Sequence, residues 1–402
     1  MENRESGDPG SLPLAGCRVV ERSRTAAAAY AGRLLATLGA RVVMLEPESG
    51  SPLRQAPPLV ESKTGGQSGS SALFTYLAAG KTSVSVDLAT EAGGEVLARE
   101  LSQADILIDD TPLAERAVAG LDPETLAEKF PALVHVSVLP FGASGPKSGW
   151  QAEEVNLIHA SGEGFLLPNG LSYEMFPERP PLKIYGHFAQ YQGGCVAALS
   201  ALSAWWAVPT AGGQYIDVSV QDAMLLCGAF ALQRLGDGSL EHRAGRSFRY
   251  GGVFEAQDGF IELLTLEDRQ WRGLVELLGN PEWAQDEALQ DSLERSRRGN
   301  EINGHVREWM ARHDVETIVS RAQQLGVPAA KYRTPDEVFH GDQERSRGLF
   351  APCKTDDGHA MEVLLAPYVF HLSPLELSGG VPALGSNNGT DPGTGPSGEG
   401  VS

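Results

Sequence analysis

Apolar runs alternate with amphipathic segments along the first 140 or so residues of the chain. Strand-like runs occur at residues 16–23, 40–48, 82–88, 104–110 and 132–142, and helical patterns separate them. The first run, GCRVVERS, leads into the alanine-rich helical segment AAAAYAGRLLATLG, and the second run, ARVVMLEPE, follows directly. Because a strand, a helix and a strand at this spacing form a βαβ unit, we expect parallel strands. The pattern predicts a doubly wound α/β domain.

The second half of the chain changes character twice. A long apolar helix is expected after Tyr191, preceded by a short strand and a turn around Gly186, and packed through Gly193, Gly194 and Ala197. Residues 243–332 then combine a hairpin-like run, GGVFEAQDGFIELLTL, with helical patterns, which predicts a smaller α+β domain. The large domain is expected to span residues 12–225 and to be completed by 333–377. Residues 1–11 and 378–402 are polar or rich in Gly, Pro, Ser and Asn, so we expect disorder there.

Composition narrows the possible partners. The 402 residues include 32 basic and 52 acidic side chains, a formal charge of −20. Binding to nucleic acid needs clustered Lys and Arg, so this balance argues against it. No apolar run approaches the roughly 20 residues that span a bilayer. The polar start MENRESGDPGSLP does not resemble a targeting peptide, and we expect a cytoplasmic protein that binds no membrane.

Several familiar cofactor motifs are missing. GKT at residues 80–82 is similar to the end of a phosphate loop, but Thr75 stands where that loop requires glycine. No GxGxxG follows the first strand, so a nicotinamide or flavin site is not supported. The four cysteines are widely spaced, and neither CxxC nor HExxH occurs, so no metal site is expected.

A series of ordered blocks resembles one known family. The blocks include LPLAGCRVVERSR, GKTSVSVDL, FGASGP, GGQYIDVSVQDA, LGVPAAKY and VPALGSN, and they extend over roughly residues 12 to 387. In this order they are similar to the family III CoA-transferases, the CaiB/BaiF group. The resemblance implies a Rossmann-like large domain, a small domain, and two chains interlocked as rings. It implies a homodimer or a heterodimer, because interlocking uses the same surfaces in both cases.

The segment PPLKIYGHFAQYQGG departs from the family pattern at a decisive position. The resemblance implies an aspartate nucleophile there, which attacks an acyl-CoA thioester and forms a mixed anhydride. This chain has Gln190 instead. The lone pair of an amide nitrogen is delocalised into the carbonyl, so glutamine cannot replace a carboxylate nucleophile.

Two other residues are candidates for acid–base chemistry. By resemblance to the family's racemase branch, Glu153 takes the place of a catalytic histidine and Gln190 that of the aspartate. A glutamate acts as a general base when desolvation raises its pKa. A surface glutamate at a helix start, favoured by the helix dipole, explains Glu153 equally well. His187, three residues before Gln190, is the third catalytic candidate.

The CoA site implied by the resemblance is only partly retained. Arg54 and Lys81 match its cations, and Arg116 is placed to reach in from one helical turn beyond the expected arginine. Ala78 stands where an asparagine is expected. The loop after the first strand carries Ala26, where the family often has glutamine. We therefore expect no required cofactor, with coenzyme A as a possible ligand. Arg246 and Arg249 are candidates to hold an anionic substrate.

Three functions remain open. The preferred one is an enzyme that acts on a carboxylated or acyl substrate by elimination, isomerisation, hydrolysis or rearrangement, without an aspartyl anhydride. The second is a true CoA-transferase in which another carboxylate substitutes. The third is the non-catalytic subunit of a heteromeric transferase. The joint loss of the nucleophile and of CoA contacts favours the first or the third over the second.

Overall fold

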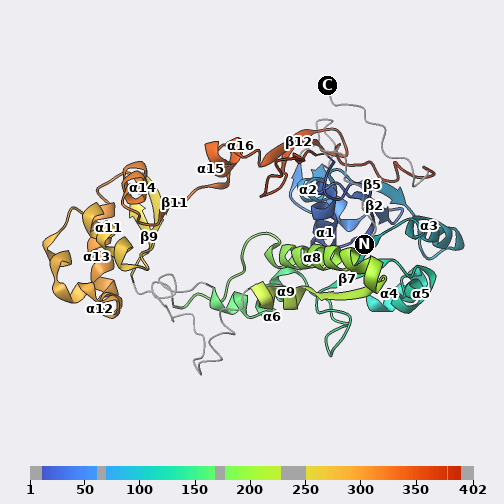
Figure 1. Ribbon diagram of the computed structural model, residues 1–402, viewed down its shortest axis with the longest axis horizontal. Helices are drawn as coiled ribbons and strands as arrows, with labels where there is room; N and C mark the ends of the chain where they lie inside the picture. Colours follow the sequence, from blue (N-terminus) through green and yellow to red (C-terminus); the bar gives the residue numbers. More distant parts are fainter. Residues whose placement is uncertain (1–10, 61–68, 168–176, 228–249, 378, 391–402) are drawn as a thin grey trace. The chain divides into compact units, whose positions relative to one another are not determined.

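The computed structural model describes residues 11–60, 69–167, 177–227, 250–377 and 379–390. The chain divides into two compact units (Figure 1). The first comprises residues 1–165, 182–239 and 345–402, and the second comprises residues 166–181 and 240–344. The chain thus returns to the first unit at residue 345, where the sequence led us to expect a return near 333.

The first unit is built on a six-stranded parallel sheet. Its strand order is β5-β2-β1-β6-β7-β8. The strands are β1 (Arg18–Arg22), β2 (Arg41–Glu46), β5 (Thr82–Ser85), β6 (Ile106–Asp109), β7 (Val134–Leu139) and β8 (Tyr215–Ser219). Val19 of β1 lies opposite Val42 on one side and Ile106 on the other, so the strand order reverses between β1 and β6. The predicted doubly wound α/β class is confirmed.

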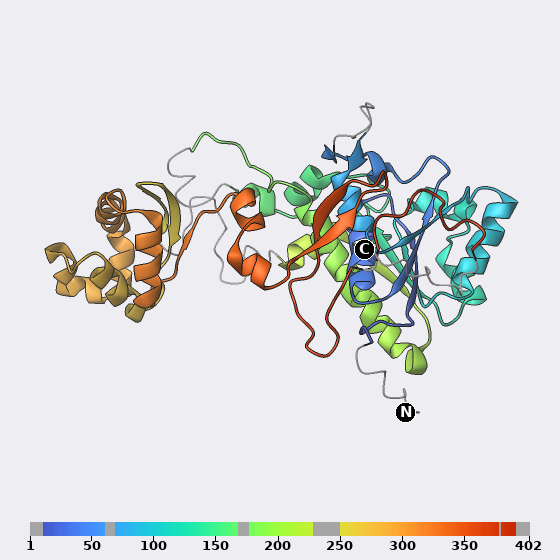
Figure 2. The same ribbon diagram turned by 90° about the horizontal axis from the view of Figure 1, so that it is seen from above.

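Helices cover both faces of this sheet (Figure 2). One face packs against α1 (Ala26–Thr37), α6 (Glu154–Ala160), α8 (Phe188–Ala211) and α9 (Val220–Cys227). The other packs against α3 (Glu91–Leu101), α4 (Leu113–Ala119) and α5 (Pro123–Lys129). The neighbouring residues Val19 and Val20 of β1 enter these two different cores. Burial on both faces explains why the strands are continuous apolar runs.

Helix α8 corrects two expectations and agrees with a third. No strand precedes it among residues 177–187, and the helix begins at Phe188, directly after the turn. A Cβ atom on Gly193 would lie 2.8 Å from Cγ2 of Val220, so glycine permits the close packing of α8 on α9. By length and composition alone, one helix among the described residues, α8, is apolar enough to cross a membrane. This corrects the expectation that no apolar run approaches such a length, and several alanines of α8 pack into the core with α1 and β7.

The C-terminal part of the first unit contains an antiparallel ribbon, in which β13 (Ala360–Leu364) pairs with β12 (Phe350–Lys354). Disorder was expected from residue 378, yet the side chains of Asn387 and Asn388 accept hydrogen bonds from the N–H groups of Ser83 (3.1 Å) and Ser85 (2.8 Å). These two serines belong to the edge strand β5, whose exposed backbone groups need partners. Five short elements lie earlier in the chain: η1 (Pro52–Gln55), β3 (Leu59–Val60), β4 (Ser70–Ser71), α2 (Ala72–Ala78) and η2 (Glu163–Leu166).

The second unit has an antiparallel sheet of order β11-β10-β9. The hairpin of β9 (Gly252–Ala256) and β10 (Gly259–Leu263) occurs where the sequence predicts it, and β11 (Ala329–Lys331) pairs with β10. The buried indole of Trp271 lies in the core of this unit. The helices are α11 (Asp268–Leu277), η3 (Glu282–Gln285), η4 (Glu287–Gln290), α12 (Ser292–Arg297), α13 (Gly299–Met310), α14 (Val315–Gln324) and α15 (Pro335–Phe339). Helix α16 (Asp342–Ser346) spans the point at residue 345 where the chain returns to the first unit.

Candidate active site

Gln190 lies in the first turn of α8 and is held through its side-chain carbonyl. Oε1 of Gln190 accepts a hydrogen bond of 2.9 Å from the backbone N–H of Ala26, the first residue of α1. The amide nitrogen Nε2 has a much weaker contact, 3.5 Å from Nδ1 of His187. Because the oxygen is occupied, the amide presents its N–H₂ group as the available donor.

His187 lies directly before α8, at its N-cap position, and makes no capping hydrogen bond. The preceding Gly186 has a φ of +87°, a left-handed conformation that suits glycine and turns the chain into the helix. The structure therefore brings together two of the three predicted catalytic residues, His187 and Gln190. Their catalytic roles stay predictions.

The third candidate, Glu153, makes its hydrogen bond within α6. It is exposed and caps α6, with its backbone N–H bonded to Oδ1 of Asn156 at 2.9 Å. Its neighbour Glu154 is buried and reaches α8 instead. The two carboxylate oxygens of Glu154 accept hydrogen bonds from the N–H groups of Ala189 (2.8 Å) and Gln190 (3.2 Å). We therefore correct the placement: Glu154, not Glu153, contacts the segment that carries residue 190.

The N-terminus of α1 is occupied by a second buried carboxylate, Asp110. It accepts hydrogen bonds from the backbone N–H groups of Arg24 (2.8 Å) and Thr25 (2.7 Å) and from the Thr25 hydroxyl (2.7 Å). Burial raises the pKa of Asp110 to about 7, although these donors oppose the rise. With Ala26 bonded to Gln190, three consecutive N–H groups are held by the protein's own side chains. They are not free to bind an anion.

A cleft of about 490 Å³ opens beside this loop, at the carboxyl ends of β1 and β2. Ligands of open α/β sheets bind at this edge, near the point where strand order reverses. Two cations line the cleft, Arg22 and Arg24, together with Ser49, Ser51 and other residues that follow β2. Arg24 also forms an exposed ion pair with Glu115 at 2.8 Å. The two arginines were not among the predicted site residues, although their position directly after the first strand was a usable signal.

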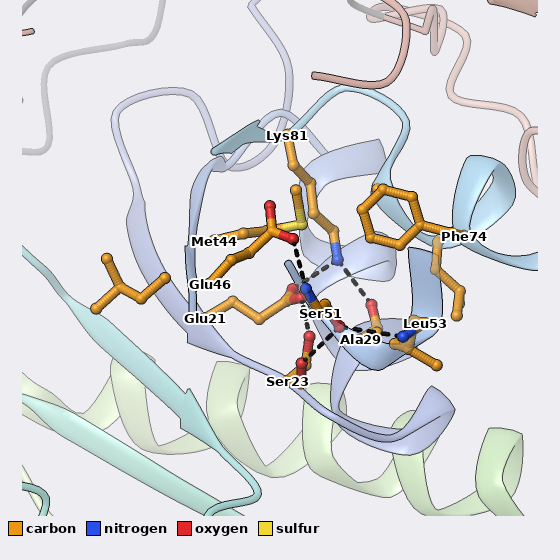
Figure 3. A pocket seen from close by; sticks show the side chains of 12 residues that line it. Glu21, Ser23, Ala29, Met44, Glu46, Ser51, Leu53, Phe74 and Lys81 are labelled. Atoms are coloured by element: carbon orange, nitrogen blue, oxygen red, sulfur yellow. Dashed lines mark hydrogen bonds and ion pairs between the residues drawn. The ribbon is translucent and has the colours of Figure 1, made fainter. Parts of the chain in front are cut away.

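Lys81, one of the predicted CoA cations, is fully buried inside the first unit (Figure 3). Its Nζ atom lies 2.6 Å from Oε2 of Glu21 and donates to the carbonyl of Ala29 at 2.8 Å. The hydroxyl of Ser23 donates to the other oxygen of Glu21 at 2.6 Å. Burial lowers the pKa of Lys81 and raises the pKa of Glu21, while their ion pair opposes both changes. A cavity of only about 10 Å³ adjoins the pair, too small for a cofactor.

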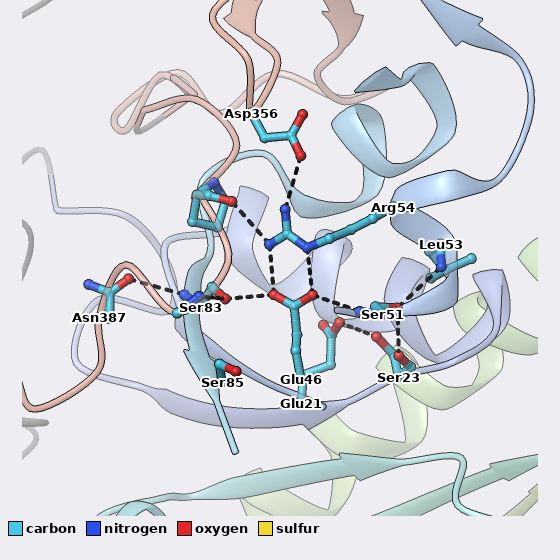
Figure 4. A network of polar contacts seen from close by, with 12 residues as sticks. Glu21, Ser23, Glu46, Ser51, Leu53, Arg54, Ser83, Ser85, Asp356 and Asn387 are labelled. Atoms are coloured by element: carbon cyan, nitrogen blue, oxygen red, sulfur yellow. Dashed lines mark hydrogen bonds and ion pairs between the residues drawn. The ribbon is translucent and has the colours of Figure 1, made fainter. Parts of the chain in front are cut away.

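Arg54 has a comparable internal role (Figure 4). Its guanidinium forms a two-pronged contact with Glu46, at 2.7 and 2.8 Å, which lowers the pKa of that carboxylate through hydrogen bonding despite burial. It also reaches Asp356 at 3.1 Å and the carbonyl of Pro382 at 3.1 Å. Arg54 therefore connects the η1 segment, β2 and the C-terminal part of the chain.

Arg116 lies on α4 and is buried. Its guanidinium donates to the carbonyl of Thr111 (3.0 Å) and the hydroxyl of Tyr215 (2.9 Å), and it lies 3.5 Å from Asp109. None of the three predicted CoA cations lines the 490 Å³ cleft. Their assignment to CoA stays a prediction, and in this structure each already has an internal partner.

Other expected residues fall outside the described part of the chain. Arg246 and Arg249, the candidates for holding an anionic substrate, are among them. Within the described residues, no group of three or more His, Cys, Asp or Glu side chains is arranged to hold a metal ion.

A six-stranded doubly wound sheet with a cleft at its switch point defines a Rossmann-like α/β protein. The chain belongs to CoA-transferase family III, whose family model matches residues 14–388. This confirms the resemblance drawn from the sequence blocks.

Individual relatives agree with this assignment. The chain is 28% identical over 385 residues to the succinate–glutarate CoA-transferase of Agrobacterium fabrum, covering 93% of this chain and 94% of that protein. It is 30% identical over 262 residues to the Thauera aromatica succinyl-CoA:(R)-benzylsuccinate CoA-transferase subunit BbsE, covering 63% and 62%. Among solved structures, a CaiB/BaiF family protein from Brucella suis matches with a TM-score of 0.80 and 27% identity, covering 94% and 97%. The chain is thus an enzyme of the CoA-transferase superfamily.

Proposed function

We propose that this protein binds an acyl-CoA thioester and acts on it by acid–base chemistry, without an acyl anhydride on residue 190. The observation that carries the proposal is the orientation of the Gln190 amide. Its oxygen is occupied by the N–H of Ala26, so its N–H₂ group is the part that meets a substrate. An amide donor stabilises a carbonyl oxygen that gains negative charge, which is the opposite electrostatic role to a carboxylate nucleophile.

No carboxylate among the described residues takes over as nucleophile at this point. Glu154 is the acidic side chain that contacts α8 here, and both of its oxygens accept backbone N–H groups. A buried carboxylate bonded in this way is held in place by the first turn of α8, and we assign it a positioning role.

His187 is the candidate for proton transfer. In the proposed step, an imidazole nitrogen removes a proton from the carbon next to the thioester carbonyl, and the C–H electron pair forms an enolate. The Gln190 amide donates a hydrogen bond to the enolate oxygen. Return of the proton from the imidazolium completes an isomerisation, and loss of a leaving group completes an elimination. Glu153 remains a second candidate base, on the exposed start of α6.

The CoA moiety is assigned to the 490 Å³ cleft. Arg22 and Arg24 supply positive charge there, and the carboxyl edge of a doubly wound sheet is the usual position for a nucleotide. Phosphate recognition by arginine is charge-assisted and contributes more than a neutral hydrogen bond.

The test is to incubate the protein with butyryl-CoA in heavy water. Mass spectrometry then follows deuterium in the acyl group and acyl adducts on the intact protein. We expect deuterium incorporation by the wild type, a loss of about 10²-fold or more in His187→Ala, and no adduct. The Gln190→Asp variant should form an acyl adduct, because it restores the carboxylate. An adduct on the wild type would instead identify a true CoA-transferase.

A second candidate is the non-catalytic subunit of a heteromeric transferase. The relative named subunit BbsE favours it, since that protein is one part of a larger enzyme. The same experiment separates the two functions. A wild type that binds CoA, exchanges no deuterium and forms no adduct is the result expected of a non-catalytic subunit.

We also propose that a second copy of this chain covers α8. Leu199, in the middle of the helix, is 67% exposed, and Leu226 on the adjoining α9 is 73% exposed. Large apolar side chains left this open on neighbouring helices are typical of an interface. Light scattering should give the mass of a dimer for the wild type and of a monomer or aggregate for Leu199→Glu. A monomeric wild type would contradict this part of the proposal.

A further inference from the structure

His135 is a buried side chain whose ring nitrogens are not used by the protein itself. It lies on β7 and is 3% exposed. Among the described residues, neither Nδ1 nor Nε2 of this imidazole has a hydrogen-bond partner. A buried polar group without a partner is costly, and in folded proteins most such groups bond to other protein groups or to ordered water. His135 therefore has bonding capacity that is left for a molecule from outside the chain.

A cavity of about 90 Å³ adjoins His135. It is lined by α5, by the segment that leads into β7 and by the segment that leads into β8. Its buried lining residues include Leu126, Leu133 and His135, and its exposed ones include Ala127, Pro131 and Gln214. A cavity with both kinds of wall is open to solvent on one side, so a ligand can reach the buried imidazole.

The volume of this cavity limits the size of a ligand. A water molecule occupies about 30 Å³ in the liquid, so the cavity has room for about three non-hydrogen atoms. Leu126 and Leu133 give the buried part of the wall an apolar surface, and His135 adds one polar group to it. A small, mostly apolar molecule with a single polar group matches this lining.

The neighbour of His135 determines which kind of polar group fits. Nε2 lies 3.6 Å from Oδ2 of Asp109, just beyond hydrogen-bonding distance. Because a lone pair facing a carboxylate oxygen is repelled, the proton of the neutral imidazole belongs on Nε2, and Nδ1 is then an acceptor. A ligand that bonds to Nδ1 has to supply a hydrogen-bond donor.

The charges near the cavity favour an uncharged ligand. No Asp, Glu, Lys or Arg is among the described residues that line it. The nearest guanidinium, that of Arg116, lies 3.5 Å from Oδ2 of Asp109 and donates to the hydroxyl of Tyr215 at 2.9 Å. An ion in the cavity would therefore be buried without a counter-charge, which is strongly unfavourable.

We propose that this cavity binds a short aliphatic alcohol, whose hydroxyl donates to Nδ1 of His135 and whose carbon atoms contact Leu126 and Leu133. The site adjoins the amino ends of β7 and β8, whereas the 490 Å³ cleft adjoins the carboxyl ends of β1 and β2. It is thus a second site, and it does not depend on the proposed function.

The test titrates the protein, labelled with ¹⁵N-histidine, with three probes of about equal size. Ethanol donates a hydrogen bond, acetonitrile only accepts one, and formate is an anion. We expect a saturable shift of the His135 Nδ1 resonance with ethanol alone, with a dissociation constant on the order of 1–10 mM for so few atoms. The resonance is assigned by its absence from the His135→Gln variant.

A variant of the exposed wall leaves His135 in place. Ala127→Leu fills the open side of the cavity and should weaken ethanol binding about tenfold or more. The matched control is Glu128→Leu, at the next exposed position of α5 and outside the cavity lining, which should bind ethanol as the wild type does. Unchanged ethanol binding by Ala127→Leu would overturn the assignment to this cavity.

Three further results would contradict the proposal. A shift that grows with ethanol without saturating reports a solvent effect and no site. A saturable response of equal affinity to acetonitrile or formate would overturn the alcohol assignment. Loss of ethanol binding in the presence of saturating CoA would place the alcohol in the 490 Å³ cleft and overturn the second site. Failure of the protein to bind CoA would affect only the proposed function, because the ethanol titration contains no CoA.

Discussion

The backbone N–H of Ala26 donates a hydrogen bond of 2.9 Å to Oε1 of Gln190 and thereby joins the first turns of α1 and α8. Two consecutive N–H groups before it, those of Arg24 and Thr25, are bonded to Asp110. The helix end that is usually open to an anionic ligand is thus closed by two protein side chains, one neutral and one acidic. In the proposed function, residue 190 therefore meets the substrate through its amide nitrogen.

The first prediction concerns that nitrogen. Gln190→Glu keeps an oxygen for the bond to Ala26 but replaces the donor with a second acceptor. We expect the affinity for butyryl-CoA to fall by about five- to tenfold, the value of one hydrogen bond, and the affinity for CoA to remain unchanged. Titration calorimetry with both ligands measures this. Equal weakening for CoA and butyryl-CoA would show that residue 190 does not contact the acyl group.

The second prediction concerns Glu154, which caps α8 from α6. Removing a capping acceptor destabilises a helix start by about 0.5–2 kcal/mol, and two buried N–H groups lose their partner here. Glu154→Ala should therefore lower the free energy of unfolding by about 2 kcal/mol in urea titrations. Glu153→Ala is the adjacent control and should have a smaller effect, because Glu153 is exposed. A larger effect at Glu153 would contradict the assigned cap.

The fold could be predicted from the sequence because local patterns of apolar residues mark the strands. Apolar runs such as ARVVMLEPE mark strands buried on both faces, and their spacing implies parallel crossovers; the six-stranded sheet agrees with this. The strand expected before Gly186 was wrong, since a short run rich in proline lacks the alternation that distinguishes a strand from a loop.

The site was harder to predict because it depends on contacts between distant segments. Gln190 and His187 were identified from one segment and lie together. The choice between Glu153 and Glu154 depended on which side of α6 packs against α8. The local sequence does not reveal this orientation. Arg54 and Lys81 matched a cation pattern, but their partners Glu46 and Glu21 come from other strands. Local sequence motifs do not show which residues from distant segments form pairs.

The third prediction follows from the buried carboxyl group of Asp110. Burial raises its pKa from 3.8 to about 7, so the folded state keeps a proton that the unfolded state releases. The stabilising contribution of this proton is complete below about pH 4 and is lost as the pH rises to about 7. At about 1.4 kcal/mol per pKa unit, the loss between about pH 5 and pH 8 is about 2–3 kcal/mol.

Asp110→Asn removes this titration. The free energy of unfolding of the wild type, measured by urea titration, should fall relative to that of Asp110→Asn across this pH range. Parallel pH profiles for the two proteins would mean that Asp110 is ionised throughout and that its hydrogen bonds outweigh its burial.

The last prediction concerns the close approach of α1 and α8, which places the Tyr30 ring 4.5 Å from that of Tyr191. A Cβ atom on Gly194 would lie 2.7 Å from the carbonyl oxygen of Ala27 and 3.0 Å from the Tyr30 ring. Gly194→Ala must therefore separate the helices, and we expect a destabilisation of about 1–3 kcal/mol. The control is Gly94→Ala in the exposed part of α3, where a Cβ meets nothing within 4 Å. There the higher helix propensity of alanine should stabilise the protein by about 0.5–1 kcal/mol. If both substitutions stabilise the protein in thermal and urea unfolding, α1 and α8 are not in the close contact described. The bond between Ala26 and Gln190 would then lose its structural basis, since it depends on the same approach.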